Sequence, residues 1–140
     1  MLITRETDYA LRVLRALSDG EQHTAGEISS TQLVPKQFAY KIIKKLDKGG
    51  LVSIARGVDG GCRLAADLRK VTLYDLMAAM EEGSSVVACM DPAYPCPWRE
   101  THGGCAIHCG LAQVQQKLNE ELRAHDPHTL IFGPSQAPSL

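Results

Sequence analysis

The feature that most constrains the fold is a glycine-rich turn between two short runs of strand character. The turn reads Gly57-Val-Asp-Gly-Gly61, and it separates Leu51–Arg56 from Cys62–Ala65. Glycines allow the chain to reverse sharply, so the two runs are expected to pair as a β-hairpin. Because a helical pattern directly precedes this hairpin, only the few folds that place a two-stranded hairpin after a helix are compatible with the sequence.

Three helical patterns precede the hairpin, over Thr4–Ser18, Thr24–Ser29 and Pro35–Lys48. The first two begin at threonines that can cap a helix, and the third begins at a proline, which suits a first helical turn. Helix, short helix, helix and hairpin is the order of a winged helix-turn-helix. We therefore expect a mainly α fold with a small β-hairpin wing, and we assign the winged helix-turn-helix to residues 1–70.

The third helix carries a concentration of positive charge. Residues 36–70 contain 9 Lys or Arg and 3 Asp or Glu, whereas the whole chain has a net charge of −1. A basic block in an acidic chain is typical of a surface that binds double-stranded DNA, although a solvated helix face is the alternative explanation. Because the third helix of this fold enters the major groove, we predict that its open side contacts DNA through Lys36, Gln37, Tyr40, Lys41 and Lys44.

Two further helices are expected after the wing. Thr72 and Asp75 can cap a connecting helix within residues 71–88. Residues 107–126 form a long helix with a narrow apolar stripe, which favours pairing with a second copy, so we predict a homodimer. The stripe consists of Ile107, Leu111, Val114, Leu118 and Leu122. Residues 133–140 are expected to be a disordered tail.

A cysteine-rich segment, residues 89–109, lies between the connecting helix and the long helix. Its cysteines are Cys89, Cys96, Cys105 and Cys109, with six, eight and three residues between them, and His108 precedes the last. Proline and glycine are frequent here, so we expect a loop. Because thiolates bind soft metals and iron–sulfur clusters, this loop is the candidate sensor.

The location of the protein bears on the chemistry of these cysteines. The N-terminus carries charges where a signal peptide needs apolar residues, and no apolar run reaches the ~18–20 residues of a membrane span. We therefore expect a cytoplasmic protein that does not contact membranes, and in the cytoplasm thiols stay reduced. A catalytic Cys–His pair also needs an orienting group and a substrate pocket. Nothing else in the sequence indicates these, so we do not expect an enzyme.

Three segments resemble a known family. They are Thr7–Arg12, Leu46–Val52 and Arg56–Gly61, and together with the cysteine loop they are similar to winged-helix regulators of the IscR and NsrR type, the Rrf2 family. The resemblance covers roughly residues 1–130. It implies a homodimeric repressor or activator, and we expect a repressor, on a near-palindromic operator. It also implies that Arg56 enters the minor groove.

The cluster-bearing members of this family imply a [2Fe-2S] or [4Fe-4S] iron–sulfur cluster held by three loop cysteines. By position these are Cys89, Cys96 and Cys105. The fourth ligand is His108, Cys109 or Asp8, and the family supplies the last from the other subunit, although Asp8 can instead pair with Arg12. The family's aromatic residue after the wing glycines is replaced by Cys62, so we expect a further thiol on the DNA side.

The resemblance implies operator binding gated by nitric oxide, redox state or iron–sulfur status. Other interpretations of the same residues remain open. Three cysteines and one histidine also suit structural zinc, and cysteines without metal can act as a thiol–disulfide switch. A winged-helix scaffold can also serve as an adaptor that binds protein and no DNA. Metal analysis and salt-dependent DNA binding distinguish these alternatives.

Overall fold

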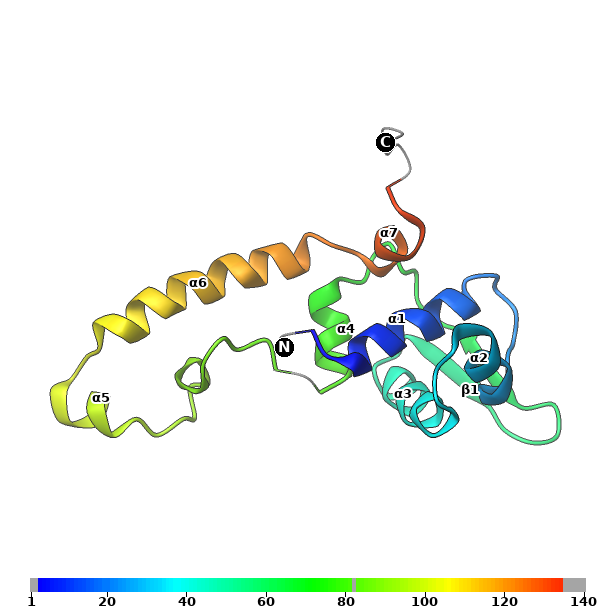
Figure 1. The fold of residues 1–140 in the computed structure, drawn as a ribbon, viewed down its shortest axis with the longest axis horizontal. Helices are drawn as coiled ribbons and strands as arrows, with labels where there is room; N and C mark the ends of the chain where they lie inside the picture. Colours follow the sequence, from blue (N-terminus) through cyan, green and yellow to red (C-terminus); the bar gives the residue numbers. More distant parts are fainter. Residues whose placement is uncertain (1–2, 82, 135–140) are drawn as a thin grey trace.

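The computed structural model describes residues 3–81 and 83–134 of the 140-residue chain. Helices α1 to α4 and the hairpin form one body, and α6 extends from it as an arm with α5 at its far end (Figure 1). The predicted fold class, mainly α with a two-stranded wing, is confirmed. The elements are α1 (Arg5–Leu17), α2 (Ala25–Gln32), α3 (Lys36–Lys48), β1 (Val52–Ala55), β2 (Gly61–Leu64), α4 (Leu73–Ala79), η1 (Ala88–Met90), α5 (Pro97–His102), α6 (Ala106–Arg123) and α7 (Pro127–Phe132).

Local capping explains where several helices begin. The hydroxyl oxygens of Thr4 and Thr24 accept hydrogen bonds from backbone N–H groups of the first turn, at 3.2 and 3.1 Å. Thr72 and Asp75 form a reciprocal capping box at the start of α4. Such caps satisfy N–H groups that have no partner within the helix. One end differs from expectation, since α2 continues to Gln32 and stops at Leu33, which has a left-handed φ of 55°.

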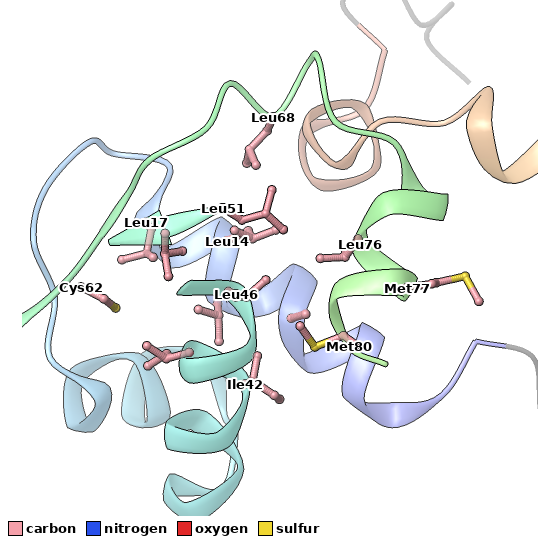
Figure 2. Packing of buried hydrophobic residues seen from close by; sticks show 14 of the residues in the cluster. Leu14, Leu17, Ile42, Leu46, Leu51, Cys62, Leu68, Leu76, Met77 and Met80 are labelled. Atoms are coloured by element: carbon pink, nitrogen blue, oxygen red, sulfur yellow. The ribbon is translucent and has the colours of Figure 1, made fainter. Parts of the chain in front are cut away.

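The core lies between α1, α3, α4 and the wing. Leu14, Leu46 and Leu76 are fully buried and point toward one another from three helices (Figure 2). Truncating one of them to alanine would cost about 2–5 kcal/mol of folding free energy, through lost burial and the cavity left behind. Because Ile42 and Leu46 bury one side of α3, the lysine-rich side of that helix faces outward.

The wing is fixed to the start of α2. In the antiparallel hairpin Ile54 pairs with Cys62. The N–H of His23 donates to the Cys62 carbonyl at 3.0 Å, and the N–H of Cys62 donates to the His23 carbonyl at 2.8 Å. A side chain at Gly61 would place its Cβ 2.7 Å from the His23 carbonyl oxygen, so glycine is required there.

This arrangement buries Cys62, which is only 2 % exposed. Cys62 does line the pocket between α3 and the wing, on the side expected to face DNA, but its thiol is covered there. Burial also raises the pKa of the Cys62 thiol to about 11, because the thiolate would lose its hydration. Cys62 is a residue of the hydrophobic core.

The cysteine-rich segment is more ordered than the predicted loop, since it contains η1 and α5. The long helix α6 covers Ala106–Arg123, so it begins one residue before the predicted 107–126 and ends three residues early. The short helix α7 was not predicted. It begins where Asp126 accepts a hydrogen bond from the Thr129 N–H at 2.8 Å, and it packs against α1. Of the predicted disordered tail, residues 135–140 lie outside the described residues.

The apolar stripe of α6 is divided between two environments. Leu122 is 4 % exposed and belongs to the core, whereas Ile107 and Val114 are 73 % and 54 % exposed. The C-terminal end of the stripe therefore packs into the core of its own chain, and the N-terminal end leaves apolar side chains exposed. Over residues 3–81 and 83–134, no helix is both long and apolar enough to cross a membrane.

Candidate DNA interface and cysteine centre

The residues predicted to contact DNA gather on one exposed surface of α3. All five are exposed: Lys36, Gln37, Tyr40, Lys41 and Lys44. Arg56 is also exposed, directly after the last residue of β1. Burial of the opposite face of α3 sets this orientation, since residues three and four apart share a side of a helix.

A pocket of about 370 Å³ lies between α3 and the wing. Tyr40 and Lys44 line it from α3, and Ala55 and Gly57 line it from the wing. The helix predicted to contact base edges, α3 (the reading helix), and the wing therefore border the same concave surface. A concave surface with Lys44 in its lining is suited to follow the backbone of a DNA duplex.

The basic surface of α3 is partly neutralised by a carboxylate from another helix. Glu6 on α1 lies 2.5 Å from the ammonium group of Lys41 and 2.7 Å from that of Lys45. The hydrogen bond from Lys41, followed by that from Lys45, holds the pKa of the Glu6 carboxyl below its usual value. These pairs could not be predicted, because about 35 residues separate the partners in the sequence.

The three predicted cluster cysteines line one pocket of about 540 Å³. Cys89 lies in η1, Cys96 precedes the first residue of α5, and Cys105 precedes the first residue of α6. His108 lines the same pocket. The backbone N–H of His108 donates to the Cys105 sulfur at 3.5 Å, which caps α6. Three separate elements therefore bring these four side chains to one place.

His108 has an unusual environment. Its Nδ1 atom is buried and has no hydrogen-bond partner within the part of the chain that the structure describes. Buried polar atoms are normally paired, so an orphaned ring nitrogen indicates a missing partner. An imidazole nitrogen beside three thiols is a donor set that suits an iron–sulfur cluster or a soft metal ion. The residues present therefore fit such a group in chemical type.

The thiols are not yet in ligand geometry. Among residues 3–81 and 83–134, no group of three or more Cys, His, Asp or Glu side chains is arranged so as to hold a metal ion. Cys109 does not line the pocket and is exposed on α6. Four of the six predicted ligands thus line one pocket, but their side chains are not arranged around a common point as the ligands of a metal would be.

Asp8 lies elsewhere in the chain. Its carboxylate pairs with Arg12 at 3.2 Å, which is the alternative role expected for it. Asp8 and Arg12 line a different pocket, between α1 and α7. Within one chain, therefore, Asp8 does not meet the loop cysteines.

Gln115 is a residue that the sequence analysis missed. Its side-chain oxygen accepts from the Val86 N–H at 2.7 Å, and its amide nitrogen donates to the Ser84 carbonyl at 2.8 Å. These bonds fasten the segment that leads to Cys89 onto α6. Glutamine at a helical position resembles any surface residue, so no sequence signal indicates this role.

The reading helix, the wing and the long arm define a winged helix-turn-helix protein of the transcription-regulator class. The chain belongs to the Rrf2 family: the family profile described as "Rrf2: Iron-dependent Transcriptional regulator" matches residues 3–130. It is similar to the HTH-type transcriptional regulator NsrR of Bacillus subtilis (strain 168). The two are 32 % identical over 139 residues, covering 93 % of this chain and 88 % of that protein.

Solved structures agree with the fold. CymR (YrzC), the global cysteine regulator of B. subtilis, superposes with a TM-score of 0.65 at 20 % identity over 92 % of this chain and 95 % of that one. IscR of T. potens superposes with a TM-score of 0.63 at 18 % identity over 97 % and 92 %. At these identities the likeness concerns the fold alone.

Family membership confirms several predictions. Rrf2 proteins are DNA-binding transcription regulators that commonly act as dimers, and they are not enzymes. The predicted class, the absence of an enzymatic role and the family resemblance are therefore confirmed. The cluster, its ligands, the signal and the homodimer of this particular chain stay predictions.

Proposed function

We propose that this protein is a DNA-binding transcriptional repressor whose operator affinity is controlled by an iron–sulfur cluster. The observation that carries this proposal is the shared pocket of Cys89, Cys96, Cys105 and His108, in which the His108 Nδ1 atom is buried and has no partner among the described residues. The family's description as iron-dependent supports it. A cytoplasmic location, in which thiols stay reduced, is part of the same proposal.

In this proposal the three thiols hold the group and His108 is the fourth ligand. His108 is preferred because it lines the pocket, whereas Cys109 is exposed outside it and Asp8 pairs with Arg12. In a cluster with one nitrogen ligand, the iron bound by that nitrogen would be the most easily attacked by oxidants or nitric oxide, because nitrogen binds iron less tightly than thiolate does. Holding the group requires the three thiols to converge further than they do here.

The DNA side of the proposal uses the exposed face of α3 and the wing. Lys36, Gln37 and Tyr40 near the start of α3 would reach base edges, and Lys41 and Lys44 would meet phosphates. Arg56 would enter the minor groove. Two copies would place two such surfaces about one helical turn (~34 Å) apart, which suits a near-palindromic operator and a homodimer.

The position of the cysteine pocket supports its role in control. The pocket lies at the far end of the arm, where Ile107 of the exposed apolar end of α6 is one of its lining residues. Rearrangement of this segment would alter the placement of the two reading helices in a dimer. A coupling of about 1–3 kcal/mol between the two sites would change operator affinity by about 5–150-fold.

The test is metal analysis of anaerobically purified protein, followed by DNA binding with and without the bound group. Iron matched by acid-labile sulfide, with a visible absorption band, is expected. Cys96→Ser should abolish iron binding, and Cys109→Ser, as the matched control, should retain it. Zinc without sulfide would instead make the pocket a structural zinc site, and no metal would leave a thiol switch. Equal operator affinity of the loaded and metal-free forms would contradict gating.

A further inference from the structure

Lys45 occupies a different environment from the other lysines of α3. Its side chain is 19 % exposed, whereas those of Lys41 and Lys48 are 53 % and 81 % exposed. Its ammonium group donates to the Glu6 carboxylate of α1 at 2.7 Å and to the Met80 carbonyl at 3.0 Å. A lysine held on two sides in this way is not free to reach a DNA phosphate.

The second of these partners lies at the end of α4. Met80 is the C-cap of α4, the residue directly after its last helical residue Ala79, so Lys45 binds a carbonyl that has no partner within the helix. The Glu81 carboxylate, next in the chain, is 3.9 Å from the Lys45 ammonium group and 3.6 Å from that of Lys48. Lys45 thus joins three elements: α1, α3 and the end of α4.

The end of α4 is also the base of the cysteine-bearing arm. Ser84 and Val86, a few residues further along the chain, are bound to α6 by the Gln115 side chain. The Arg123 guanidinium of α6 also lies over the Tyr74 ring of α4, 4.1 Å from its centroid. Through Gln115 and Arg123, α6 is therefore tied both to the segment that follows α4 and to the first turn of α4, on either side of the carbonyl that Lys45 binds.

We infer that Lys45 is a positioning residue that couples the placement of the arm to that of the DNA-reading helix. The inference rests on the proposed function only in taking α3 as the surface that binds DNA, and it does not depend on a cluster. Two simpler roles are possible for Lys45. A phosphate contact would contribute to the salt dependence of DNA binding, and a purely stabilising ion pair would leave the arm and α3 energetically independent.

A double-mutant cycle on metal-free protein separates these roles. The probe is a DNA duplex selected from a random library by the wild-type protein. Gln115→Leu loosens the arm at a residue remote from α3, and Lys45→Met removes the ammonium group while keeping most of the aliphatic stem. Operator affinity is measured by fluorescence anisotropy at several salt concentrations for the wild type, both single variants and the double variant.

The coupling predicts a specific pattern. Gln115→Leu should change DNA affinity by about fivefold or more in the wild-type background, and that effect should largely disappear in the Lys45→Met background. Lys45→Met should leave the salt slope unchanged. Lys44→Met is the matched control, because Lys44 is exposed and makes no ion pair with any described residue. It should lower the salt slope by about 0.9 and preserve the effect of Gln115→Leu.

Several results would overturn the inference. The first is a change in DNA affinity on Gln115→Leu that is equal in the wild-type and Lys45→Met backgrounds. The second is no change in DNA affinity on Gln115→Leu in the wild-type background. The third is a reduced salt slope of DNA binding in Lys45→Met. If Lys45→Met does not fold, as judged by circular dichroism, Glu81→Gln replaces it, because Glu81 is exposed. Glu81→Gln should then reduce the change in DNA affinity caused by Gln115→Leu, and an unreduced change would contradict the coupling. Failure of the wild type to select any DNA would instead contradict the proposed function.

Discussion

The carboxylate of Glu6 on α1 lies 2.5 Å from the ammonium group of Lys41 on α3. One of the residues predicted to bind DNA is therefore already paired within the protein. For Lys41 to contact a phosphate it must exchange one anion for another. The net free energy of DNA binding gained from that contact is consequently smaller than the charge of Lys41 alone suggests.

Glu6→Gln should strengthen DNA binding at low salt. Lys41 would then neutralise a phosphate without losing an ion pair, so the slope of log affinity against log salt should steepen by about 0.9. Glu120→Gln is the control, because it removes an equal charge from an exposed residue paired with Lys117 on α6. Anisotropy titrations at four salt concentrations measure both slopes, and an unchanged slope in Glu6→Gln would argue against a phosphate contact by Lys41.

Arg56→Ala should weaken operator binding by about 1–3 kcal/mol. Arg56 is exposed beside the wing turn, where an arginine can reach the minor groove. Arg69→Ala removes the same charge from an exposed residue beyond the hairpin and should have a smaller effect. Unchanged affinity and salt slope in Arg56→Ala would remove the wing from the DNA interface.

His108→Ala should shorten the lifetime of a bound iron–sulfur cluster. Its Nδ1 atom is buried in the cysteine pocket without a hydrogen-bond partner in residues 3–81 and 83–134, so the substitution removes one proposed ligand and leaves the three thiols. Asp8→Asn is the comparison variant, since Asp8 pairs with Arg12 in another pocket. The decay of visible absorption in air measures both. A faster decay in Asp8→Asn than in His108→Ala would assign the fourth ligand to Asp8.

Cys62 should resist alkylation in the native protein. The residue is 2 % exposed and burial raises the pKa of its thiol to about 11, so at pH 8 almost none of it is the reactive thiolate. Cys109 is exposed and should react with iodoacetamide under the same conditions. Mass spectrometry of metal-free protein, with and without denaturant, identifies the modified sites. Rapid native modification of Cys62 would mean that the wing opens readily.

His23 should make stability depend on pH. Its ring lies 2.7 Å from the Asp19 carboxylate and 3.2 Å from that of Glu27, and the hydrogen bond to Asp19, followed by that to Glu27, raises the pKa of His23. A raised folded-state pKa stabilises the protein fully below the unfolded value of about 6.5, and this contribution is lost as pH rises through the folded-state pKa.

Replacement of the histidine tests this sign. The difference in free energy of unfolding between wild type and His23→Gln should be larger at about pH 5.5 than at about pH 8.5. Urea denaturation at the two pH values measures it. Asp19→Asn removes the nearer carboxylate and should reduce the pH dependence. A difference that grows toward alkaline pH would contradict the assignment.

The starts of several helices were predictable because capping is local. Thr4, Thr24 and Thr72 each accept a hydrogen bond from a backbone group two or three residues away. The outward side of α3 was also predictable, since it follows from the spacing of the apolar residues that pack inward. The short helix α7 was not predicted, because the pair Asp126-Pro127 is compatible both with the end of the preceding helix and with the cap and first turn of a new one.

The sequence by itself determined the types of donor in the cysteine segment, the basic character of α3 and the order of helices and hairpin. Only the tertiary structure decided which of these residues meet. His108 lines the cysteine pocket and its neighbour Cys109 does not, because consecutive residues of an α-helix are rotated by about 100°. The partners of Lys45, and the burial of Cys62 beside His23, were likewise decided by the packing of segments that lie far apart in the chain.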